Sequence, residues 1–132
     1  MFSHVTLGTN DPARARPLYD ALFAVLGRPL FFESPDGDFF GYGTAAGRLF
    51  ICRPFDGKPA SIGNGTHVAL DAPTRQTVRD AHAAAIAAGA RDEGSPGERP
   101  HYHEHYYGAY FRDLDGNKLQ VVCHLPVSQA GP

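Results

Sequence analysis

Two histidines stand at the same position of two similar segments of the chain. His4 opens the segment His4-Val5-Thr6-Leu7, and His67 opens His67-Val68-Ala69-Leu70. Because side chains alternate along a strand, both histidines fall on equivalent faces of their segments. If a pseudo-two-fold axis relates the segments, the two imidazoles approach each other across a cleft. Imidazole suits Zn, Fe, Ni and Cu, so the pair predicts a metal site.

A third candidate ligand comes from the last strand expected in each repeat. Aligning Arg48–Ile51 with Lys118–Val121 puts Phe50 and Gln120 in corresponding positions. Two histidines and one oxygen ligand, with the remaining positions open to water and substrate, can hold a reactive divalent metal. The neutral amide of Gln120 would neutralise the ion less well than a carboxylate. A buried glutamine that hydrogen-bonds across the barrel explains the same residue equally well.

A second cluster of polar side chains occupies residues 99–107, Arg-Pro-His-Tyr-His-Glu-His-Tyr-Tyr. If this segment is extended, its alternating histidines share a face, and its phenols offer donors on apolar bodies. Its place before a hairpin fits a substrate lid or a cleft wall. The alternative is a pinned loop whose side chains satisfy backbone groups. The candidates for moving a proton are His103, His101 and Glu104, and those for contacting substrate are Tyr102 and Tyr107.

Several other residues that can carry chemistry have simpler explanations. Cys52 lies near the end of an expected strand and can border the cleft, but its apolar neighbours favour an inert buried thiol. His82 lies on the apolar face of an alanine-rich helix, which predicts a packed and hydrogen-bonded histidine. We assign no role to His124, and we interpret Asp115-Gly116-Asn117 as turn residues only.

Two helices are expected to position these residues. In the first repeat Asp11 is the cap, Pro12 takes the first helical position, and Gly27 ends the helix. Pro17 suggests that this helix begins or bends there. In the second repeat Thr74 is the cap and Gly89 ends the helix.

Three short strands are expected after each helix, because short apolar runs are separated there by turn residues. They are Leu30 to Glu33, Phe39 to Gly43, Leu49 to Cys52, Ala90 to Asp92, Gly108 to Arg112 and Lys118 to Val122. The fold class is therefore α+β, with two βαβββ modules. The modules cover about residues 2–55 and 66–124, joined by a linker at 56–65 and followed by a frayed tail at 125–132. We expect the two modules to curl their strands into a half-open mixed β-barrel with helices outside and a cleft inside.

The totals restrict the class of protein. A chain of 132 residues fits one domain. Its net charge of −2, with scattered basic residues, gives no sign of nucleic-acid binding. It has no run of apolar residues long enough to cross a membrane and no signal-peptide pattern. Free thiols at Cys52 and Cys123 suit a reducing compartment, so we expect a cytoplasmic protein that acts on a small molecule.

From about His4 to His124, the chain resembles the vicinal oxygen chelate superfamily. The resemblance rests on the His-Val-x-Leu openings, the paired helices and the ending Tyr-Gly-Ala-Tyr-Phe-Arg-Asp-Leu-Asp-Gly-Asn at residues 107–117. The Arg-Pro-His-Tyr-His segment is most similar to the glyoxalase/bleomycin resistance protein/dioxygenase-like branch. By analogy, the resemblance also implies a homodimer.

The resemblance implies where a metal would bind. Metal-using members take ligands from the first and fourth strands of each module, which correspond here to His4, Phe50, His67 and Gln120. Phe50 cannot be a ligand, so at most three ligands remain. Our leading hypothesis is a small-molecule enzyme of lyase/isomerase or dioxygenase type, whose divalent metal (Zn, Ni, Mn or Fe(II)) binds two adjacent substrate oxygens. The alternative is a metal-free protein that binds or sequesters a small molecule, for which Phe50 and the tyrosine-rich loop are equally suited.

Overall fold

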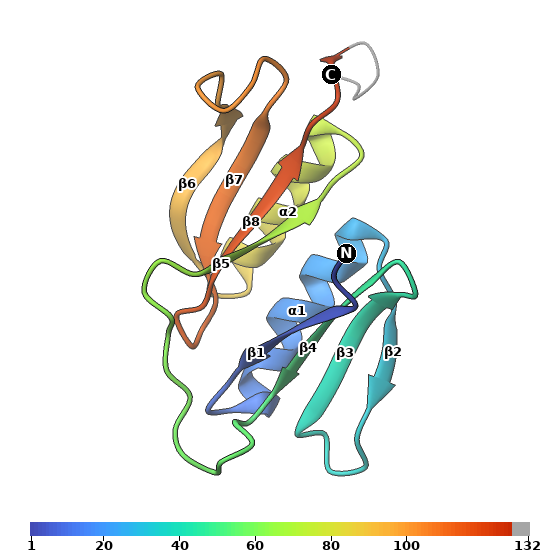
Figure 1. The fold of residues 1–132 in the computed structure, drawn as a ribbon, viewed down its shortest axis with the longest axis vertical. Helices are drawn as coiled ribbons and strands as arrows, with labels where there is room; N and C mark the ends of the chain where they lie inside the picture. Colours follow the sequence, from blue (N-terminus) through green and yellow to red (C-terminus); the bar gives the residue numbers. More distant parts are fainter. Residues whose placement is uncertain (128–132) are drawn as a thin grey trace.

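The computed structural model describes residues 1–127 and shows two βαβββ units, which confirms the predicted repeat and fold class (Figure 1). The last five residues of the expected tail lie outside the described part. The first unit contains β1 (His4–Gly8), α1 (Pro12–Leu26), β2 (Leu30–Glu33), β3 (Phe39–Thr44) and β4 (Gly47–Cys52). The second contains β5 (His67–Asp71), α2 (Arg75–Ala87), β6 (Arg91–Glu98), β7 (Tyr107–Arg112) and β8 (Lys118–Cys123).

The two units have the same strand order and register. Their sheets run β1-β4-β3-β2 and β5-β8-β7-β6, and the first and last strands of each unit pair in parallel. Phe50 lies opposite Thr6, and Gln120 lies opposite Ala69, so the predicted alignment of these two residues is confirmed. Within residues 1–127 the strands form two separate four-stranded sheets rather than a closed barrel.

Each helix covers one face of its own sheet and leaves the other face open. Alternate residues of β4 and β8, such as Leu49, Ile51, Leu119 and Val121, are buried on the helix side. Burying each such side chain stabilises the fold by roughly 1.5–3 kcal/mol. The helices α1 and α2 also pack against each other, and in Figure 1 both lie behind the sheets. We call the face of each sheet that points away from its helix the open face.

The helix ends follow the sequence signals, with one difference in each helix. The Asp11 carboxylate accepts a hydrogen bond from the backbone N–H of Arg14, and Gly27 ends α1 in the left-handed conformation (φ 66°). Although Pro17 lies inside it, α1 begins at Pro12. In α2, the Thr74 cap is confirmed, but the helix ends one residue earlier than expected, with Ala88 as its C-cap.

The strand β6 is longer than the sequence predicts. The expectation stopped at Asp92 because Gly94, Pro96 and Gly97 are typical of a loop. The strand continues to Glu98 with an irregular register against β7. It is the outer strand of its sheet, where a proline costs no hydrogen bond to a neighbouring strand.

The turn at residues 113–117 does more than reverse the chain, contrary to our expectation. The hydroxyl of Tyr19 donates a hydrogen bond to Asp113, and the amide of Asn117 donates to the backbone carbonyl of Gly8 (2.9 Å). The backbone N–H of Asn10 donates to Asp115 (2.8 Å). This turn of the second unit therefore joins it to the first.

In residues 1–127, no helix is long and apolar enough to span a membrane.

Candidate functional site

The open face of the first sheet carries a cluster of aromatic rings, which we call the aromatic face: His4, Phe31, Phe32, Phe39 and Phe50. The Phe50 ring is central, and the centroids of the other rings lie 5.3 Å (His4), 5.5 Å (Phe31), 5.5 Å (Phe39) and 6.4 Å (Phe32) from it. All four contacts are edge-to-face, the geometry that aromatic pairs favour. Phe31, Phe32 and Phe39 are each about 40% exposed, so the aromatic face is open to a ligand.

Two backbone features bring these rings together. The register of β2 against β3 shifts between Leu30 and Phe32, and both Phe31 and Phe32 contact Phe50. Beneath them, Gly41 leaves room for the rings to lie on the sheet. A Cβ at Gly41 would stand 2.7 Å from the Phe50 ring and 3.1 Å from the Phe31 ring.

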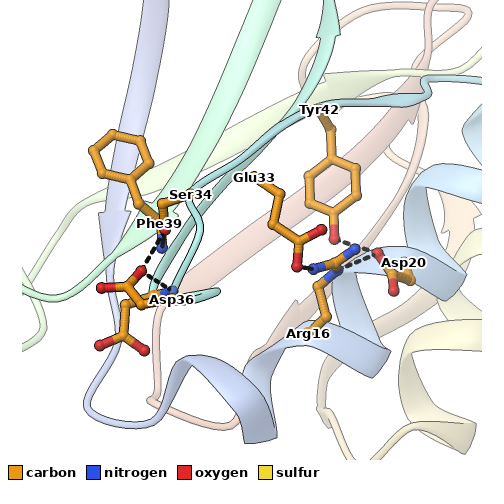
Figure 2. A network of polar contacts seen from close by, with 8 residues as sticks. Arg16, Asp20, Glu33, Ser34, Asp36, Phe39 and Tyr42 are labelled. Atoms are coloured by element: carbon orange, nitrogen blue, oxygen red, sulfur yellow. Dashed lines mark hydrogen bonds and ion pairs between the residues drawn. The ribbon is translucent and has the colours of Figure 1, made fainter.

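Hydrogen bonds in the turn between β2 and β3 hold the hairpin that carries three of these rings (Figure 2). The hydroxyl of Ser34 donates to Asp36 (2.6 Å) and accepts from the backbone N–H of Phe39 (3.1 Å). The hydrogen bond from Ser34 lowers the pKa of the Asp36 carboxyl, with a further contribution from the backbone N–H of Asp38. The hydrogen bond from the backbone N–H of Phe39 to Ser34 thus fixes the position of Phe39.

A second network in Figure 2 attaches this hairpin to α1. The Arg16 guanidinium donates to Asp20 (2.9 Å) and to Glu33 (2.9 Å), the last residue of β2. The phenol of Tyr42 donates to the same Asp20 carboxylate (2.6 Å). Burial, and then this hydrogen bond, raise the pKa of Tyr42. The edge strand β2 is therefore held from the helix side, while its phenylalanines stay on the open side.

On the second sheet, the face that points away from α2 is covered by the loop at residues 99–106. Gln120 is only 1% exposed, and its side-chain amide donates a hydrogen bond to the phenol of Tyr106. Burial, followed by hydrogen bonds with Tyr102 and Tyr106, raises the pKa of Tyr110. The loop thus closes over Gln120, as expected of a lid or of a pinned loop.

The histidines of this loop do not share one face, because residues 99–106 form turns instead of an extended strand. The His103 Nδ1 accepts a hydrogen bond from the backbone N–H of His105 (3.1 Å), so the Nε2–H donates to the Nδ1 of His124 (2.9 Å). Both nitrogens of His103 are engaged, which counts against it as a free base. His101 packs on Tyr102, with ring centroids 4.2 Å apart.

Three other predicted site residues lie as follows. Tyr107 faces α2 and is 9% exposed, with the Arg75 guanidinium 5.0 Å from its ring and its hydroxyl accepting a hydrogen bond from Arg79 (3.2 Å). It is therefore on the helix side of its sheet, not on the open face. Cys52 is half-buried opposite Phe39, and burial raises its thiol pKa. Glu104 is exposed, with its carboxylate 3.8 Å from His105.

A cleft of about 570 Å³ lies between the two units. His4, Arg28, Arg48 and His124 line it, together with Asp71 and apolar side chains of both units. His67 is not among the lining residues, and its ring lies edge-to-face with that of Tyr110, with the ring centroids 5.8 Å apart. His4 and Arg48 therefore lie where the aromatic face meets the cleft.

The residues fit the four-ligand metal set of the resemblance poorly. The place beside His4 where the first unit would supply its second ligand is filled by the Phe50 ring. In the second unit, the Gln120 side chain is already hydrogen-bonded to Tyr106. Across the part of the chain that the structure describes, no three histidine, cysteine, aspartate or glutamate side chains are grouped so as to hold a metal ion. In the first sheet, His4 thus stands beside the Phe50 ring instead of beside a second ligand of that set.

Comparison with known proteins identifies the family. The model of the Glyoxalase/Bleomycin resistance protein/Dioxygenase superfamily matches residues 1–121. The chain belongs to this superfamily. A search among curated proteins finds no match.

Solved structures show the same fold. A glyoxalase/bleomycin resistance protein from Albidiferax ferrireducens T118 is 36% identical, with a TM-score of 0.85, over 95% of this chain and 99% of that one. A lactoylglutathione lyase from Agrobacterium tumefaciens is 19% identical, with a TM-score of 0.63, over 93% of this chain and 92% of that one. At 19% identity, the similarity to the lyase shows only that the two proteins share a fold.

Sequence reasoning missed most of the aromatic face. It selected Phe50 through the repeat, but left Phe31, Phe32 and Phe39 as ordinary strand residues. The available signal was three phenylalanines within nine residues of one hairpin. It also assigned no role to His124, which pairs with His103.

Proposed function

We propose that this protein binds a small aromatic molecule on the aromatic face and does so without a metal. The observation that carries this proposal is the edge-to-face cluster around Phe50, open to solvent beside a cleft. Small-molecule sites are typically concave and mostly apolar, with a few polar groups that fix orientation. Each 100 Å² of apolar surface that a ligand removes from water contributes roughly 2.5 kcal/mol before the cost of association.

A second candidate is the metal-dependent enzyme of lyase/isomerase or dioxygenase type. What favours it is that His4 and His67 occupy the same position in their two sheets. Each is the first residue of its strand, His4 opposite Arg48 and His67 opposite Lys118. With Gln120 they would supply three donors. Since His4 and His67 belong to separate sheets, we propose that such a site would require the facing sheet of a second copy, in the homodimer that the family resemblance implies.

Two measurements on protein purified without an affinity tag distinguish these candidates. The first is elemental analysis after incubation with Zn, Ni, Mn and anaerobic Fe(II), compared with His4→Ala and His67→Ala variants. The second is calorimetric titration with 1-naphthamide, a flat neutral aromatic. We expect no metal that depends on both histidines, and saturable binding of the aromatic that weakens in Phe50→Ala.

Two results would overturn the proposal. Near-stoichiometric metal that is lost in both histidine variants would establish the metal site instead. Titration without heat or saturation in the parent protein would show that the aromatic face is not a binding site.

A further inference from the structure

Two arginines that line the cleft lack an anionic partner within residues 1–127. Arg28 and Arg48 both line the cleft and are both exposed. In the described chain, neither side chain has a hydrogen bond or an ion pair, whereas Arg16, Arg53 and Arg112 each pair with a carboxylate. An arginine that keeps its donors free at a cavity is available to a ligand.

Arg48 connects the cleft to the aromatic face. Its guanidinium carbon lies 4.5 Å from the centroid of the Phe31 ring. On the neighbouring strand it is opposite His4, whose ring contacts Phe50. The guanidinium lies over the Phe31 ring, so a ligand ring that packs on Phe50 beside Phe31 has its edge next to this guanidinium.

The charges around the cleft favour an anion. Among the described residues, its lining contains Arg28 and Arg48, the imidazoles of His4 and His124, and only one carboxylate, that of Asp71. In the first unit, the carboxylates of Glu33 and Asp38 are paired with Arg16 and Arg53, respectively. The volume, about 570 Å³, is in the range of small-molecule sites.

From this charge pattern we infer that the ligand is an aromatic carboxylate, with its rings on the aromatic face and its carboxylate in the cleft at Arg48 and Arg28. This inference rests on the proposed function, since it adds an anionic group to an aromatic ligand. The planar guanidinium matches a carboxylate in two parallel hydrogen bonds, which gives selectivity over a neutral amide of the same shape.

The test compares two probes that differ only in this group, 1-naphthoate and 1-naphthamide, by calorimetric titration at pH 7.5. We expect the parent protein to bind 1-naphthoate at least about tenfold more tightly, in line with the strength of charge-assisted hydrogen bonds. In Arg48→Gln, and more so in Arg28→Gln/Arg48→Gln, that preference falls toward equality, because the variants lose more affinity for 1-naphthoate than for 1-naphthamide. The matched control is Arg14→Gln, which removes an exposed α1 arginine that does not line the cleft and should keep the preference.

The possible failures are distinguishable. If neither probe binds, the aromatic site itself is refuted. If both probes bind equally to the parent, or if Arg14→Gln lowers the preference as much as Arg48→Gln, the carboxylate assignment is refuted and the aromatic site stands. A probe-independent loss of binding in the double variant, with an unchanged circular dichroism spectrum, would also contradict a specific carboxylate contact.

Discussion

Gly41 is the residue on which the aromatic face depends most directly. It is buried on β3 under the rings of Phe50 and Phe31, and any larger residue would place a methyl group inside their contact distance. Its backbone is not in the left-handed region, so the requirement is for space and not for conformation. The absence of a Cβ atom at this position therefore allows the Phe50 and Phe31 rings to pack where they do.

The substitution Gly41→Ala should displace Phe50 and weaken aromatic binding. A Cβ 2.7 Å from the ring forces the side chain to move, and such overpacking costs about 1–3 kcal/mol of the free energy of unfolding. The measurement is 1-naphthamide titration together with urea unfolding. Gly47→Ala is the control, because a Cβ there meets nothing within 4 Å; equal loss of binding in both variants would contradict a role for ring position.

At this scale the sequence supported some inferences and not others. The repeat predicted that Phe50 and Gln120 occupy matching positions, because strand alternation is regular. It did not predict that Phe31 and Phe32 would both contact Phe50, since that depends on a register shift in β2 that leaves no clear pattern in the residues. Nor did it show that Tyr107 faces α2, because that strand carries tyrosine on both of its faces.

Among the elements, the loop at residues 99–106 determines access to the second sheet. Its backbone is closed by a hydrogen bond from the N–H of Arg99 to the carbonyl of Tyr106 (2.8 Å), and the phenol of Tyr106 accepts a hydrogen bond from Gln120 on β8. The alternating histidines suggested an extended segment, but the local turns and the pairing of His103 with His124 override that pattern. Local sequence spacing cannot reveal such a contact between residues 21 positions apart.

Removing the hydroxyl that Gln120 binds should loosen this loop. In Tyr106→Phe the amide of Gln120, which is 1% exposed, loses its acceptor, and leaving such a donor unsatisfied costs about 1–3 kcal/mol. We expect faster amide hydrogen exchange at Arg99 and Tyr102 and a lower urea midpoint. Glu104→Gln, at an exposed position of the same loop, should change neither; unchanged exchange in Tyr106→Phe would show that the phenol does not hold the loop.

For the whole molecule, the sequence predicted two units but not how they are joined. Periodicity describes each element and its own buried face, so it indicated a βαβββ repeat. The turn Asp113–Asn117 has residues typical of any tight turn, and their contacts with Tyr19, Asn10 and Gly8 are about 100 positions away in the sequence. The packing of α1 against α2, which leaves the two sheets separate, likewise depends on contacts that only the folded chain reveals.

The buried hydrogen bond from Tyr19 to Asp113 links stability to alkaline pH. Burial, and then the charge of Asp113, raise the pKa of Tyr19 well above its ordinary value of 10.0, so the folded state keeps the phenol protonated. In the unfolded chain the phenol ionises near pH 10, which favours unfolding. The contribution of Tyr19 to stability is therefore fully present below about pH 10 and is lost as the pH rises above it.

The substitution Tyr19→Phe should reveal this contribution and its pH dependence together. At pH 8 it leaves Asp113 without one donor, although Asn117 still donates to the same carboxylate (3.0 Å), and should lower the free energy of unfolding by about 1–2 kcal/mol. Between pH 8 and 11 the parent should lose about 1 kcal/mol more than the variant, because the variant has no phenol to ionise on unfolding. Urea unfolding across this range measures both. A difference between parent and Tyr19→Phe that stays constant up to pH 11 would mean that the phenol ionises equally in both states, and that the link between the units does not depend on its proton.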